Sequence, residues 1–193
     1  MTVGVLLLAA GQSRRYGADK RLARLPTGET LLRASLALVL RTELPVTVCL
    51  RPDDVNLLAE LQAQEQEQEL SVVSCDRAAL GMGATLAQGM AALPPWEAVI
   101  VMLADMPWIK SASLLALARI VTDQTIAVPV FRDQRGNPVA FGREYFDQLG
   151  DCQGDQGARS VVMSHASMVT EVAVEDEGIL LDVDHPDDLS ANR

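Results

Sequence analysis

Short apolar segments recur along the chain, and segments with helical periodicity separate them. The first, Val3–Leu8, is apolar throughout except for one glycine, which is typical of a central parallel strand buried on both faces. We expect strands at residues 3–8, 46–50, 70–74, 96–103 and 125–130. We expect helices at residues 30–40, 55–67, 84–93 and 111–121, the last with Ser111 as its N-cap. This alternation predicts a three-layer α/β/α fold with a mostly parallel, Rossmann-like sheet.

The alternation changes in the last third of the chain. Residues 131–136 have the composition of a turn, and residues 138–141 have that of a short strand. Residues 169–174 and 178–182 predict a late hairpin packed on the sheet edge. We therefore expect a late antiparallel or mixed edge. A chain of 193 residues suits one well-buried core, so we also expect a single domain, 1–193.

Composition excludes several classes of partner. The formal net charge of −10 disfavours nucleic acid, because the phosphate backbone would be repelled. The three cysteines have no CxxC spacing, which predicts neither a disulfide framework nor a zinc site and fits a reducing cytoplasm. The opening apolar run is shorter than the roughly 20 residues that span a bilayer and follows no basic segment, so we expect no membrane partner.

The segment after the first strand combines small residues, two glycines and several cations. Small residues let backbone N–H groups approach a phosphate chain, and the cations neutralise its charge. The candidates for this triphosphate cradle are Ala10, Gly11, Gln12, Ser13, Arg15 and Lys20. Further cations nearby, such as Arg21, add to the local positive charge. The spacing does not match the Walker A pattern, and an ordinary turn with solvated bases is the alternative.

A second glycine segment, residues 80–89, leads from a turn into a predicted helix. Gly83 lies in the turn, and Thr85 is placed to donate a hydrogen bond to a base or ribose. The segment only approaches the Rossmann dinucleotide fingerprint, because Leu86 stands where the last glycine belongs. An NAD site here is therefore a weak alternative, and a tight turn without a ligand also stays open.

Asp105 directly follows the most apolar predicted strand. A carboxylate at the carboxyl end of a parallel strand points into the crevice where α/β sheets bind ligands. Because Mg²⁺ binds one or two carboxylates plus phosphate oxygens, we interpret Asp105 as a metal anchor rather than a helix cap. The acidic segment 182–188 offers a second ligand, for which we choose Asp184, with Asp182 on the same predicted strand face. A capping role for this segment remains the alternative.

Six segments, taken in order, resemble the molybdenum-cofactor nucleotidyltransferases of the MobA-like NTP transferase superfamily. The resemblance is closest to the cytidylyltransferases that convert molybdopterin cofactor to its cytosine dinucleotide. It covers nearly the whole chain, although Tyr16 and His185 replace the more usual methionine and threonine. The segments are AAGQSRRYGADKRLARLPTGETLL, LGMGATLAQG, ADMP, RGNPVAFGREYF, GDQGAR and LDVDHPDDL.

The resemblance implies a Mg²⁺-dependent enzyme, with Mn²⁺ as an alternative metal, that transfers CMP from CTP to the terminal phosphate of molybdopterin. The implied catalytic residues are Arg15, Lys20 and Asp105, and the metal ligands are Asp105 and Asp184. The implied nucleotide-binding residues are Leu8, Ala9, Ala10, Gly11, Gln12, Ser13, Arg15, Lys20, Gly83, Thr85 and Asp105. The implied acceptor-binding residues are Asn137, Pro138, Gly154, Asp155 and Arg159.

The base and the partners follow from the same resemblance. Cytidylyltransferases of this group resemble LAAG at residues 8–11, whereas guanylyltransferase relatives tend to carry glycine where Ala10 stands. Residues 1–110 would form the nucleotide-binding half and residues 111–193 the acceptor-binding half. We expect a cytoplasmic enzyme whose product goes to a molybdoenzyme or its maturation chaperone. The alternatives are guanylyl transfer, transfer to another phosphorylated small molecule, and a non-catalytic protein that binds and delivers the cofactor.

Overall fold

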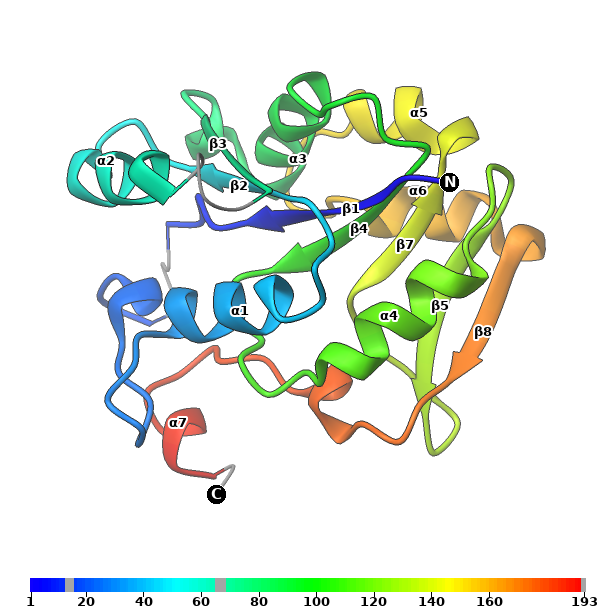
Figure 1. Cartoon of the computed structure of the whole chain (residues 1–193). Helices are drawn as coiled ribbons and strands as arrows, with labels where there is room; N and C mark the ends of the chain where they lie inside the picture. Colours follow the sequence, from blue (N-terminus) through cyan, green and yellow to red (C-terminus); the bar gives the residue numbers. More distant parts are fainter. Residues whose placement is uncertain (13–15, 65–68, 192–193) are drawn as a thin grey trace.

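The chain folds into an α/β architecture, which this computed structural model describes for residues 1–12, 16–64 and 69–191 (Figure 1). The strands are β1 (Val3–Leu8), β2 (Val46–Leu50), β3 (Leu70–Ser74), β4 (Ala98–Leu103), β5 (Ile126–Phe131), β6 (Gln134–Arg135), β7 (Val139–Gly142) and β8 (Val169–Ala173). The α-helices are α1 (Leu31–Leu40), α2 (Val55–Gln64), α3 (Met82–Ala91), α4 (Ser111–Ile120), α5 (Phe146–Gly150), α6 (Arg159–Ser164) and α7 (Asp188–Ala191). The short 3₁₀ helices are η1 (Lys20–Leu22), η2 (Ala78–Leu80), η3 (Arg143–Tyr145), η4 (Ala166–Met168) and η5 (Glu177–Leu180).

One sheet runs through the molecule. Its strand order is β3-β2-β1-β4-β7-β5-β6, and β8 pairs with β5 outside this path. β3, β2, β1 and β4 pair with one another in parallel, whereas β7 is antiparallel to both β4 and β5. The predicted α/β fold with a mixed late edge is therefore confirmed. The carboxyl ends of β1, β2 and β4 meet at one edge of the sheet, which is where α/β proteins bind ligands.

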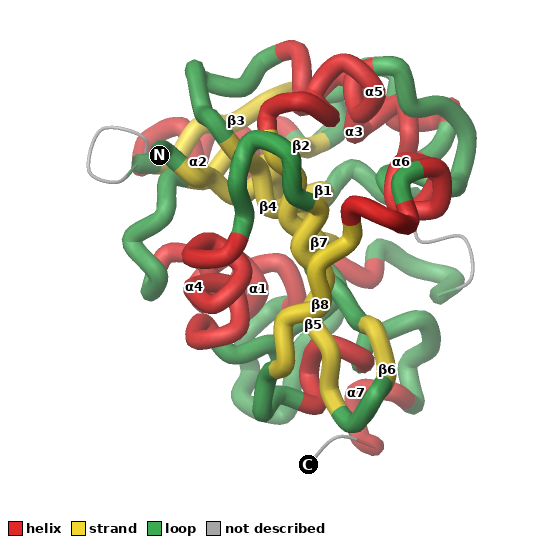
Figure 2. Tube along the Cα trace, turned by 90° about the vertical axis from the view of Figure 1, so that its right-hand side faces the viewer, coloured by secondary structure: helices red, strands yellow, loops and turns green. Residues whose placement is uncertain are grey.

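Two apolar cores sandwich the sheet, because successive side chains of a strand point to opposite faces. In β1, Val5 and Leu7 enter the core that α1, α2 and α4 cover, while Leu6 and Leu8 enter the core of α3, α5 and α6. Figures 1 and 2 show these two groups of helices on opposite sides of the strands. No described helix is long and apolar enough to cross a membrane.

The predicted late hairpin is wrong. Residues 169–173 do form a strand, β8, but it pairs in parallel with β5. Instead of a second strand, η5 follows, and the stretch 181–184 is irregular. The reason is tertiary: Ile179 is fully buried and its carbonyl oxygen accepts a hydrogen bond from the Asn137 backbone at 2.9 Å. Asp182 and Asp184 therefore do not share a strand face.

The predicted N-cap of α4 is also wrong. Lys110 occupies the cap position, and the Ser111 hydroxyl instead donates to the carbonyl oxygen of Leu38 at 2.7 Å. Asp176, which is distant in sequence, contacts the start of α4: it accepts from the Lys110 backbone N–H at 2.7 Å and from the Ser113 hydroxyl at 2.6 Å. The predicted helix over residues 55–67 is described only to residue 64, where α2 ends, and residues 65–67 lie outside the described residues.

Candidate nucleotide site

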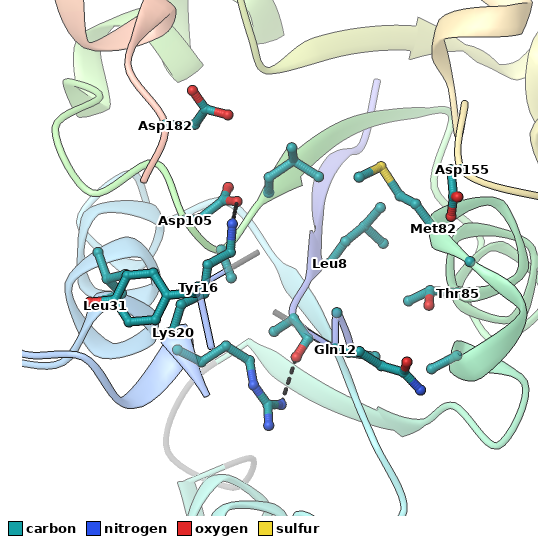
Figure 3. A pocket seen from close by; sticks show the side chains of 18 of the residues that line it. Leu8, Gln12, Tyr16, Lys20, Leu31, Met82, Thr85, Asp105, Asp155 and Asp182 are labelled. Carbon is teal, nitrogen blue, oxygen red and sulfur yellow. Dashed lines mark hydrogen bonds and ion pairs between the residues drawn. The ribbon is translucent and has the colours of Figure 1, made fainter. Parts of the chain in front are cut away.

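A cavity of about 560 Å³ lies at the carboxyl edge of the parallel strands. The loop after β1, the turn that leads into α3 and the residues after β4 line it, together with η1 and the acidic segment near the C-terminus. Figure 3 shows Lys20 and Asp105 on one side of this cavity, Met82, Thr85 and Asp155 on the other, and Leu8 and Gln12 between them. The volume falls in the range of small-molecule sites.

The loop after β1 supplies a wall of backbone and small side chains. The residues of this loop in the cavity lining are Leu8, Ala9, Ala10, Gly11 and Gln12. The backbone N–H of Ala9 donates to the carbonyl oxygen of Cys49 at 3.0 Å, so the start of the loop is tied to β2. A Cβ added at Gly11 would meet no atom of the described residues within 4 Å, which leaves space for a ligand beside the backbone. Ser13 and Arg15 of the predicted cradle lie outside the described residues.

Lys20 and Asp105 contact each other inside the cavity (Figure 3). Lys20 Nζ donates to Asp105 Oδ2 at 2.5 Å and to the carbonyl oxygen of Val183 at 2.9 Å, and it lies 3.6 Å from Asp184 Oδ1. The side chains of Lys20 and Asp105 are 18% and 15% exposed. One ammonium group therefore joins three segments that are far apart in the sequence.

The carboxylates beside Lys20 fit a divalent cation. Asp105 Oδ1 is buried and has no hydrogen-bond partner in the part of the chain that the structure describes. Partial burial and the neighbouring charges of Asp105 and Asp184 raise the pKa of Asp182, which means that negative charge is concentrated here. Within residues 1–12, 16–64 and 69–191, no three His, Cys, Asp or Glu side chains are grouped to hold a metal alone. Two carboxylates and the phosphate oxygens of a nucleotide are the donor set that Mg²⁺ commonly takes.

The opposite wall depends on two close backbone contacts. Gly81 has φ = +112°, and a Cβ there would lie 2.7 Å from the carbonyl oxygen of Gly154 and from Asp155 Oδ1. Gly83 donates its backbone N–H to the same Gly154 oxygen at 2.7 Å, and its Cβ would lie 2.6 Å from the Gln153 backbone. Glycine at both positions lets the residue 153–155 loop lie against the start of α3. Gly83 thus packs behind the cavity wall, whereas Gly81 lines it.

Some of the predicted site residues line the cavity and others do not. The described cavity lining includes Leu8, Ala9, Ala10, Gly11, Gln12, Lys20, Thr85, Asp105, Asp155 and Asp184. It does not include Gly83, Asn137, Pro138, Gly154 or Arg159. Asp155 is thus the member of the predicted acceptor set that reaches the cavity. Arg159 is exposed at the start of α6, and Asn137 is bound through its backbone to η5.

Several lining residues were not among the predicted site residues. They are Tyr16, Arg21, Leu31, Ala78, Ala79, Leu80, Gly81, Met82, Leu103, Ala104 and Asp182. Gly81 and Met82 belong to the glycine segment that the sequence singled out, and Asp182 to the acidic segment, so both signals were present. We expected Arg21 to add to the local positive charge, but Asp19 and Asp54 pair with its guanidinium and neutralise it. Asp54 lies too far along the chain for a local pattern to indicate this pair.

The fold and the cavity define an α/β protein with a candidate ligand site at the carboxyl edge of its parallel strands. A structure of an Rv0371c homologue from Mycobacterium sp. strain JC1 is 30% identical, with a TM-score of 0.80, and the match covers 98% of this chain and 93% of that one. The Rv0371c protein of Mycobacterium tuberculosis H37Rv in complex with manganese is 26% identical, with a TM-score of 0.77 and coverage of 99% and 97%. Molybdopterin-guanine dinucleotide biosynthesis protein A from Archaeoglobus fulgidus shares the fold at 18% identity, with a TM-score of 0.65 and coverage of 97% and 95%.

The family follows from the sequence itself. The MobA-like NTP transferase domain model matches residues 5–169, and this chain belongs to that family of nucleotidyltransferases. Members of the family bind nucleoside triphosphates, and nucleotidyltransferases of this kind typically use divalent metals. No curated protein sequence matches the chain.

Proposed function

We propose that this protein transfers CMP from CTP to the terminal phosphate of molybdopterin and releases pyrophosphate. The observation that carries the proposal is the contact of Lys20 Nζ with Asp105 Oδ2 at 2.5 Å inside a cavity whose wall is the loop after β1. This arrangement supports a phosphate-binding role for Lys20 and a metal-binding role for Asp105 in one cavity. The family match supports nucleotidyl transfer as the reaction class.

In the proposed reaction, a phosphate oxygen of the acceptor forms a bond to the α-phosphorus of the triphosphate. The bond from that phosphorus to the bridging oxygen breaks, and pyrophosphate leaves with the electron pair. No side-chain nucleophile is required, so catalysis depends on positioning and on neutralisation of charge. A divalent cation, when bound, would supply Lewis-acid neutralisation of phosphate oxygens.

The residues have distinct proposed roles. Asp105 and Asp184 would hold Mg²⁺, or Mn²⁺ in its place, together with the nucleotide phosphates. Lys20 and Arg15 would face the phosphates that leave, and the backbone of residues 10–12 would contact the same chain. Thr85 would donate a hydrogen bond to the ribose or the base. Asp155 belongs to the proposed acceptor side, with residues 1–110 as the nucleotide half and residues 111–193 as the acceptor half of one domain.

The choice of CTP depends on one methyl group. Ala10 is fully buried in the cavity wall, where the guanylyltransferase relatives tend to carry glycine. We place the protein in the cytoplasm, which its free thiols Cys49, Cys75 and Cys152 support. The product would then pass to a molybdoenzyme or its maturation chaperone.

One experiment tests the proposal. The protein is incubated with Mg²⁺, molybdopterin and each of labelled CTP, GTP, ATP and UTP, and the dinucleotide product is identified by mass. We expect the cytosine dinucleotide and stoichiometric pyrophosphate. If the product is the guanine dinucleotide, the nucleotide substrate is GTP and not CTP. Binding of molybdopterin without pyrophosphate release from any triphosphate would indicate a non-catalytic delivery protein and would overturn the proposed reaction.

A further inference from the structure

We infer that Arg21 is a positioning residue that holds Lys20 in the cavity, an inference that rests on the proposed function. Arg21 is only 4% exposed, which is unusual for arginine. Its guanidinium is satisfied on both edges. Nε and Nη2 donate to Asp19 at 2.8 and 2.5 Å, and Nη2 and Nη1 donate to Asp54, the former at 2.7 Å. Nη1 also donates to the carbonyl oxygen of Ala9 at 2.7 Å.

The charges show that this group is not itself a phosphate site. Arg51 completes the network, because its Nη2 donates to Asp19 at 2.7 Å and to Asp54 at 3.1 Å. Two guanidinium groups thus face two carboxylates. Burial alone would raise the pKa of Asp54, but hydrogen bonds from Arg21 and Arg51 outweigh it and lower that pKa to about 2. Asp53 Oδ1 also lies 3.5 Å from Arg51 Nε, so the network carries no excess of positive charge. Such a network attracts a phosphate chain weakly, so its role is structural support for a neighbour.

That neighbour is Lys20. Lys20 and Arg21 are consecutive residues of η1, a 3₁₀ turn of three residues that has little stability of its own. Asp19 caps this turn by accepting from the Arg21 backbone N–H at 3.2 Å. The Arg21 side chain therefore ties η1 to the end of β1 at Ala9 and to the residues before α2 at Asp54. The backbone from which the long Lys20 side chain extends is therefore held by contacts to two other segments, although Arg21 itself also lines the cavity.

A double-mutant cycle tests the coupling. Arg21→Lys keeps the charge but cannot make both bidentate contacts. Binding of inorganic tripolyphosphate in Mg²⁺ is measured by calorimetry for the wild type, Arg21→Lys, Lys20→Met and the double variant. We expect Arg21→Lys to weaken binding about tenfold when Lys20 is present and less than about twofold in the Lys20→Met background. Far-UV circular dichroism reports that each variant is folded, and Asp54→Asn replaces Arg21→Lys in the cycle if that variant is not.

The outcomes separate the inference from the proposed function. An equal loss of affinity in both backgrounds, after Lys20→Met alone has weakened binding, overturns the inference and leaves the proposed function standing. If Lys20→Met binds tripolyphosphate as the wild type does, both the inference about Arg21 and the proposed role of Lys20 are wrong. The matched control is Arg33→Lys, which alters an exposed pair between Arg33 and Glu60 on α1 and α2. This control is expected to bind as the wild type does.

Discussion

Asp105→Asn separates charge from shape in the proposed metal site. The substitution keeps the size of the side chain but removes the carboxylate that pairs with Lys20. The second oxygen of that carboxylate is buried and has no hydrogen-bond partner among residues 1–12, 16–64 and 69–191. Two effects on stability oppose each other. Loss of a charge-assisted hydrogen bond costs about 2 kcal/mol. Burial is the main cause that raises the pKa of Asp182, but the charge of Asp105 adds to it, and the substitution relieves that repulsion. Lys20 also keeps its bond to Val183. We therefore expect the melting temperature to fall by only about 5 °C or less.

The effect on activity should be much larger. A preorganised charge that stabilises the transition state is worth about 3 to 4 kcal/mol, so kcat/KM should fall by about 100-fold or more. The assay is release of pyrophosphate at saturating Mg²⁺, with Mn²⁺ affinity measured by electron paramagnetic resonance in the presence of CTP. Retention of Mn²⁺ affinity and of turnover within about threefold of the wild type would refute Asp105 as the metal anchor.

Three further predictions follow from the structure. Ala10→Gly removes one fully buried methyl group, so the free energy of unfolding should fall by about 0.8 kcal/mol. The ratio of kcat/KM for GTP over CTP should rise as well, and an unchanged ratio contradicts a role of Ala10 in base selection. Gly81→Ala should lower the melting temperature, because φ is +112° and the new Cβ would collide with Gly154, at a cost of about 2 kcal/mol. Gly11→Ala should melt as the wild type does but raise the KM for CTP. Equal melting temperatures of the two variants would contradict this reasoning. The pKa of Asp54 is lowered from 3.8 to about 2 on folding, so ionised Asp54 adds about 2 kcal/mol to the free energy of unfolding above pH 4. This contribution is lost as pH falls towards 2. The free energies of unfolding of the wild type and Asp54→Asn, measured in urea, should therefore converge between pH 4 and 2, and a constant difference would contradict the prediction.

Local sequence patterns determined most of the first half of the fold. The boundaries of β1, β2 and β3 agree with prediction. β1 and β2 are buried at every residue, so each carries the nearly continuous apolar run of a strand covered on both faces. The prediction of a late hairpin was wrong because the local pattern there is weak. Residues 178–182 carry no periodic pattern strong enough to decide between strand and turn, and the contact of η5 with Asn137 decided it.

In the candidate site, too, the sequence determined the local features and the tertiary structure determined the contacts between distant segments. The sequence alone indicated that a loop of small residues follows the first strand and that Asp105 follows the fourth in chain order, because both features are local. It could not indicate that Lys20 Nζ would lie 2.5 Å from Asp105, that Arg21 would be buried against Asp54, or that Gly83 would pack behind the cavity wall. Those contacts join residues from different crossover connections, and only the pairing of β1 with both β2 and β4 brings the ends of those connections to one edge of the sheet.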